Sequence, residues 1–120
     1  ILSFFEVYDP HSFDLIVTGD LGEVGSALNR QLLSRRGYTL GDRYTDCGLE
    51  IFSRAQDVHA GGSGCGCSAA VLCSHILPAM ERGEWRRVLF CPTGALMSPT
   101  SSQQGESIPG ICHVLLLEGK

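Results

Sequence analysis

Three short runs of consecutive apolar residues constrain the fold of this chain most. The first lies within Asp14–Thr18 and ends at Gly19, and the second, Arg87–Cys91, is ended by Pro92. The third, Cys112–Glu118, is apolar at successive positions. Short apolar runs bounded by turn residues are typical of buried strands, and a run without alternation indicates a strand covered on both faces. We therefore predict three strands over these ranges, the last one covered on both faces.

Two segments between these runs carry helical signals. Glu23–Arg36 has an acidic residue in its first turn, basic residues in its last turn, and Gly37 as its stop. Its apolar residues share one helical face: Val24, Leu28 and Leu32. The second helix is predicted over Ser68–Arg82, with Ser68 as N-cap and a kink at Pro78, because proline removes a backbone hydrogen bond.

The order strand, helix, strand predicts an α/β domain with helices flanking a sheet. We expect a helix over Ile1–Tyr8 and a short strand over Leu49–Phe52. Thr93–Gly110 has no clear period and is longer than most unstructured loops. We therefore expect that segment to be functional or to pack on chain outside this sequence.

Composition narrows the classes of function. The 120 residues suit one domain, and the net charge of −4 comes without a basic stripe, which argues against a nucleic-acid partner. Six cysteines are unevenly spread and no leader precedes them, so we expect a reduced, intracellular protein. No apolar run approaches the roughly 20 residues of a membrane span, so any membrane association should be peripheral. The start on an apolar run without methionine indicates a fragment of a longer chain.

The run "QDVHAGGSGCGCSAAVL" concentrates the candidate chemistry. A zinc site needs several converging ligands, and only Cys65 and Cys67 are closely spaced, although His59 and Cys47 could complete a set in space. A disulfide between residues so close in sequence would be strained. We therefore expect no metal, no cofactor and no disulfide at this run.

Two compatible interpretations of the glycines remain. Glycine lets the backbone turn sharply and approach another surface, and this interpretation covers Gly61, Gly62, Gly64 and Gly66. The same loop leads into the start of a helix, where free backbone N–H groups can bind a carboxylate or phosphate. Asp20, in "VTGDLGEVG", would either cap the first helix or accept a hydrogen bond from a ligand. The spacing there is not that of a dinucleotide-binding motif.

Longer motifs carry a resemblance to a known family. "DLIVTGDLG", "QDVHAGGSGCGCSA" and "TGALMSPTSSQQGESIPGI" closely resemble the C-terminal half of the stage V sporulation protein AD family, over nearly the whole chain. That family resembles the thiolase fold. The resemblance implies that residues 1–120 form a C-terminal thiolase-like half-domain, with a mixed sheet of five strands or fewer, cut from a longer protein of two halves.

The resemblance also implies a function. The family is expected to bind dipicolinic acid, free or as its calcium chelate, for uptake into the developing spore, peripherally at the inner forespore membrane and beside the other proteins of its operon. The fold allows a homodimer. A planar dicarboxylate suits backbone N–H groups and hydroxyls. The implied binding residues are Asp20, His59, Gly62, Ser63, Cys65, Gly66, Cys67, Ser68, Ser101 and Ser102.

Catalysis is not implied, because two catalytic positions of related enzymes hold glycine here. Aligned with ketoacyl synthases, the histidine position falls at Gly19 and the asparagine position at Gly66. Cys91 falls near the acid/base cysteine of thiolases. The alternative is therefore an acyltransferase or thioesterase that uses a thiol such as Cys65 or Cys91. A base within hydrogen-bond reach of a thiol would favour the enzyme, and an open pocket rimmed by N–H groups would favour binding.

Overall fold

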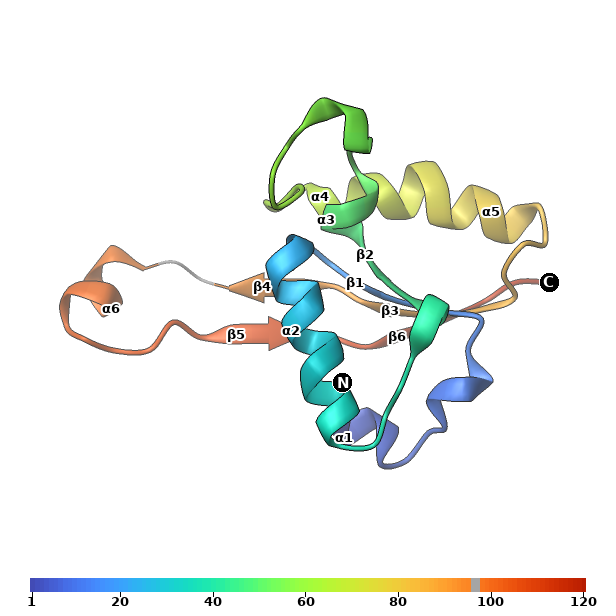
Figure 1. The fold of residues 1–120 in the computed structure, drawn as a ribbon, viewed down its shortest axis with the longest axis horizontal. Helices are drawn as coiled ribbons and strands as arrows, with labels where there is room; N and C mark the ends of the chain where they lie inside the picture. Colours follow the sequence, from blue (N-terminus) through green and yellow to red (C-terminus); the bar gives the residue numbers. More distant parts are fainter. Residues whose placement is uncertain (96–97) are drawn as a thin grey trace.

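The computed structural model describes residues 1–95 and 98–120, and its centre is a mixed four-stranded sheet (Figure 1). The strand order is β2-β1-β3-β6, with β1, β2 and β3 parallel and β6 antiparallel to β3. The strands are β1 (Leu15–Thr18), β2 (Tyr44–Asp46), β3 (Arg87–Cys91) and β6 (Leu115–Glu118). The prediction of an α/β fold with a mixed sheet is confirmed, with four strands in the main sheet.

Helices and a second, two-stranded sheet complete the fold. The helices are α1 (Leu2–Phe5), α2 (Gly22–Arg35), α3 (Cys47–Glu50), α4 (Cys67–Val71), α5 (Leu77–Glu81) and α6 (Pro99–Gln103). The small sheet pairs β4 (Thr93–Ala95) with β5 (Gly110–Cys112). Figure 1 shows α6 at the outer end of this pair, so that residues 93–95 and 98–112 form an arm extending from the body. No helix in the described residues has the length and apolar character needed to cross a membrane.

The main sheet has a separate apolar cluster on each face. Successive residues of a strand point to opposite faces, so Ile16 of β1 packs with Leu33 of α2, while Val17 packs with Val71 and Ile76 on the other side. The chain passes from β1 through α2 to β2, and then returns past β1 to β3. Right-handed crossovers in opposite directions place their helices on opposite faces. All four residues of β1 are buried, as predicted for a strand covered on both sides.

The predicted helices are confirmed with shifts at their ends. The first starts one residue early, at Gly22, and the second forms one continuous helical segment from Cys67 to Glu81. Its middle, Leu72–Ile76, is a π-helical turn placed just before Pro78. Proline lacks a backbone N–H, and the wider turn accommodates that loss within the helix. The segment Ile1–Tyr8 contains the short helix α1, as expected.

The apolar face predicted for α2 does not face the sheet. Val24, Leu28 and Leu32 are more than half exposed, whereas the buried positions of this helix are Gly22, Ser26 and Leu33. Small residues bring the start of the helix close to its neighbours, and only its last turns bury a large side chain.

The strand expected over Leu49–Phe52 is wrong. The strand is β2, and the chain turns into α3 directly after it, because the side chain of Asp46 accepts a hydrogen bond from the N–H of Gly48 and caps the helix. The sequence interpretation missed this cap and so placed the strand after the turn.

The third predicted strand is divided. Cys112 belongs to β5 in the arm, and β6 begins at Leu115. Leu115 and Leu116 are exposed by 48% and 43%, so the expectation that this strand is covered on both faces is wrong for the described chain. The reason is topological, because β6 is an outer strand that pairs with β3 alone in this sheet.

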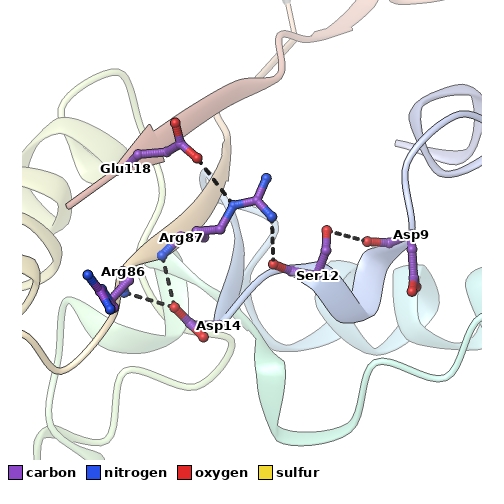
Figure 2. A network of polar contacts seen from close by, with 6 residues as sticks. All are labelled: Asp9, Ser12, Asp14, Arg86, Arg87 and Glu118. Carbon is purple, nitrogen blue, oxygen red and sulfur yellow. Dashed lines mark hydrogen bonds and ion pairs between the residues drawn. The ribbon is translucent and has the colours of Figure 1, made fainter. Parts of the chain in front are cut away.

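A polar network holds the starts of β1 and β3 and the end of β6 together (Figure 2). Asp14 accepts hydrogen bonds from the N–H groups of Arg87 (2.9 Å) and Arg86 (2.8 Å), which lower the pKa of its carboxyl group. The Arg87 guanidinium lies 3.3 Å from a carboxylate oxygen of Glu118 and donates to the carbonyl of Ser12. The candidate site lies at the opposite end of these strands.

Candidate functional site

The centre of the site is the buried carboxylate of Asp46, at the end of β2. It accepts hydrogen bonds from the Thr18 hydroxyl at 2.6 Å and from the N–H groups of Leu21, Gly22 and Gly48 at 2.9–3.0 Å. No part of Asp46 is exposed. Four hydrogen bonds to one carboxylate compensate for the free-energy cost of burying its charge. One side chain therefore fixes the end of β1 and the starts of α2 and α3.

The turn after β1 is closed by contacts that leave no room for side chains. Gly22 has a φ of +67°, and a Cβ there would lie 2.5 Å from the carbonyl oxygen of Ala60. The N–H of Glu23 donates to that same oxygen at 2.8 Å. The turn is thus held against the segment that leads into the glycine run.

Asp20 joins three segments. Its carboxylate accepts hydrogen bonds from the hydroxyl of Thr93 at 2.9 Å and from the N–H of Gly64 at 3.1 Å, and its own N–H donates to the Thr93 hydroxyl at 3.0 Å. The capping role expected for Asp20 from the sequence is wrong. Asp46 contacts the start of α2, and Asp20 instead ties the glycine run to the beginning of the arm.

The glycine run itself divides into a packed part and an open part. Gly61 and Gly62 lie against α3, where the N–H of Gly62 donates to the carbonyl of Gly48 at 2.7 Å, and an added Cβ at either glycine would collide with α3 or the residues after it. The close approach predicted for these two glycines is confirmed. Gly64 has a φ of +100°, a backbone conformation that favours glycine. Gly66 has no atom within 4 Å of its missing Cβ in the described chain, so close approach does not explain the glycine at that position.

The open part presents backbone donors to solvent. Ser63, Gly64, Cys65 and Gly66 are exposed, and Ser68 is half-buried. Among the hydrogen bonds formed by the described residues, none uses the N–H groups of Cys65, Gly66 or Ser68. These groups precede or begin the continuous helical segment that starts at Cys67. The arrangement can accept an anion, because N–H groups at a helix start are free to donate.

Gly19 and Gly66, which the resemblance aligned with catalytic residues, differ in their surroundings. A Cβ at Gly19 would lie 2.5 Å from the backbone nitrogen of Thr93 and 2.7 Å from its hydroxyl, so a histidine side chain has no space there. Gly66, by contrast, faces open space within the described residues. The first position is sealed by the start of the arm, and the second is accessible.

None of the thiols of Cys47, Cys65, Cys67 and Cys91 has the setting of an acyl-transfer nucleophile. Cys65 is exposed, whereas Cys91 is fully buried and its pKa is raised, chiefly by the neighbouring Cys112 thiol. Burial raises the pKa of Cys67, and raises that of Cys47 to about 12. In the hydrogen bonds of residues 1–95 and 98–120, no imidazole or carboxylate contacts a cysteine thiol. The same residues contain no group of three or more potential metal ligands of the His, Cys, Asp and Glu types.

Three predicted site residues lie away from the open loop. His59 has a φ of +52° and a side chain that is 90% exposed, 3.8 Å from the carboxylate of Asp57. It borders a groove of about 820 Å³ beside α3, which residues 62–68 do not line. Ser101 and Ser102 lie in α6 at the outer end of the arm, far from α4 in Figure 1. The structure joins Asp20 to Gly64 and places the Cys67 thiol against the Gly19 carbonyl, but it does not bring these three residues to the loop.

Two residues of the site were missed in the sequence. Asp46 precedes Cys47-Gly48, and an aspartate directly before a small residue is a recognisable N-cap signal. Thr93 carries no such signal, because its role depends on the arm folding back beside Asp20.

Comparison with known proteins identifies the family. The family model described as Stage V sporulation protein AD (SpoVAD) matches residues 3–118. Stage V sporulation protein AD of Bacillus subtilis (strain 168) is 49% identical over 106 residues, which cover 88% of this chain and 31% of the relative. The chain thus spans about a third of the length of that relative. It belongs to the stage V sporulation protein AD family.

Proposed function

We propose that this chain is the C-terminal, non-catalytic part of a thiolase-like protein of spore formation, and that it contributes to binding dipicolinic acid for uptake into the spore. Membership of the stage V sporulation protein AD family is the observation that carries the proposal. The binding surface is the open loop Ser63–Ser68, with Asp20 holding it in place through Gly64. The protein would act at the inner forespore membrane, beside the other proteins of its operon.

The chemistry of the loop supports a dicarboxylate ligand. The N–H groups of Cys65, Gly66 and Ser68 can donate to one carboxylate, and the hydroxyls of Ser63 and Ser68 can donate to the same anion. No side-chain cation is needed, because helix-start N–H groups themselves favour negative charge. Ser101 and Ser102 are dropped from this surface, since α6 lies at the far end of the arm.

The enzyme alternative receives less support. An acyl-transfer thiol needs a lowered pKa and a base, whereas Cys65 has no such partner among the described residues and Cys91 is buried with a raised pKa. Gly19 also has no space for the histidine that related enzymes use. Losing one charge-stabilising donor typically costs about 100- to 1000-fold in rate. We therefore expect no acyl-thioester turnover.

The test is calorimetric titration of dipicolinate, with and without calcium, into the full-length protein and two glycine variants. Gly64→Ala alters the loop at a φ of +100°, and Gly83→Ala is the matched control, at a φ of +78° after α5. We expect roughly tenfold weaker binding for the first variant, about 1.4 kcal/mol, and unchanged binding for the second. Equal affinity of Gly64→Ala and wild type, or thioester turnover abolished by Cys91→Ser, would contradict the proposal.

A further inference from the structure

The cysteines at the base of the arm form a pair that the proposed function does not use. Cys91 ends β3, and Cys112 ends β5, the strand that returns from the arm. Thr93 pairs with Cys112 in the small sheet, so Cys91 lies two residues before the direct partner of Cys112. Residues two apart along an extended chain point to the same side and reach diagonal neighbours. The topology therefore brings two thiols together from opposite ends of the arm.

The contacts agree with this placement. The Cys112 sulfur lies 3.8 Å from the carbonyl oxygen of Cys91, and Cys112 packs against the apolar cluster that contains Cys91. Each of the two thiols is also the largest influence on the pKa of the other. Their surroundings differ, since Cys91 is fully buried and Cys112 is half-buried. Cys112 also lines a hollow of about 580 Å³ with Asp20 and Thr93.

We propose that Cys91 and Cys112 are a thiol pair that is reversibly oxidised to a disulfide by low-molecular-weight disulfides. The Cys112 thiolate attacks the small disulfide, forms a mixed disulfide and releases one small thiolate. Cys91 then attacks the Cys112 sulfur and releases the second. The two protein thiols lose two electrons and two protons, and the small disulfide gains them as two thiols.

The order of attack follows from the two environments. The neighbouring Cys91 thiol lowers the pKa of Cys112, so the accessible thiol is also the one that ionises more readily. The pKa of Cys91 is raised chiefly by the same interaction. Once Cys112 is capped as a mixed disulfide, this influence is gone and Cys91 can ionise and resolve it. The product links β3 to β5 and closes the whole arm into a covalent loop.

The experiment uses oxidised glutathione on the full-length folded protein, followed by acid quench, alkylation under denaturing conditions and peptide mapping. Trypsin leaves both cysteines in one peptide, because residues 88–119 contain no lysine or arginine. Cleavage after Glu106 separates them, so a disulfide appears as two linked peptides. We expect the Cys91–Cys112 link to form, to disappear on reduction, and to be absent from Cys112→Ser.

The controls separate pairing from general reactivity. Cys73 is exposed in the middle of the helical segment, so Cys73→Ser should leave the Cys91–Cys112 link intact. Oxidation in urea should lose the preference for this pair, because the fold brings the thiols together. Glutathione retained on Cys112 with Cys91 still free to alkylate would overturn the proposal. So would a link from Cys112 to any other cysteine.

Discussion

The two glycine turns of this chain look alike in sequence but are built differently. The turn after β1, Gly19–Gly22, is enclosed by Asp46, Thr93 and Ala60. The turn before α4, Ser63–Gly66, is exposed and holds one side-chain contact, from Gly64 to Asp20. The first turn uses glycine because neighbours occupy the space of a side chain, and the second leaves its backbone accessible. Glycine therefore permits close packing in the first turn and leaves backbone N–H groups accessible in the second.

The largest effect should come from removing the centre of the closed turn. Asp46→Ala removes the acceptor of three N–H groups, two of them buried, and of the Thr18 hydroxyl. We expect the free energy of unfolding to fall by about 3–5 kcal/mol, because hydrogen bonds to a charged group are strong and unpaired buried donors are costly. Urea unfolding of the full-length protein measures this loss. A loss below about 1 kcal/mol would show that the closed turn does not depend on Asp46.

Overpacking the closed turn should have the next largest effect. In Gly19→Ala, the new methyl group would lie 2.5 Å from the backbone nitrogen of Thr93, which cannot move without displacing the arm. We expect about 1–3 kcal/mol of destabilisation. Thermal unfolding checks this value, and Thr93→Ser provides a control that keeps the hydroxyl bonded to Asp20. Unchanged stability in Gly19→Ala would remove the distinction between the two turns.

Backbone strain in the open turn should cost less. Gly64 has a φ of +100° and no atom within 4 Å of its missing Cβ in the described chain, so Gly64→Ala introduces strain without a collision. We expect a loss of about 1 kcal/mol in the free energy of unfolding. The same urea titration used for Asp46→Ala gives this number. A loss as large as that of Gly19→Ala would mean that the open turn is also closely packed in the whole protein.

Gly66→Ala should have the smallest effect. Gly66 has an ordinary φ of −96° and open space around it in the described residues. Alanine reduces the freedom of the unfolded chain but is a poorer N-cap than glycine, and these effects nearly cancel. We expect a change within about 0.5 kcal/mol, by the same unfolding measurement. A large loss would indicate that another part of the protein packs against Gly66.

The sequence predicted a helix or a strand well where the residues of that element and its immediate neighbours carried the signal. The boundaries of β1 and β3 follow from apolar runs ended by Gly19 and Pro92, and α2 follows from its charged ends and Gly37. The site was predicted less completely. Gly61 and Gly62 were recognised as closely packed, but the partner surface, α3, had been taken for a strand. Asp46 was therefore missed, although it holds the site together.

The sequence alone determined the family, the α/β order of elements and the presence of two glycine turns, because each of these depends on residues that are neighbours along the chain. Tertiary structure alone decided which turn is closed. Thr93 lies 73 residues after Asp20, and Asp46 lies 24 residues after Gly22, yet these pairs make the contacts that seal the first turn. Such contacts depend on strand order and crossover direction, which place distant residues at one end of the sheet. The same order places β6 at an outer edge and leaves Leu115 and Leu116 exposed, which its composition did not indicate.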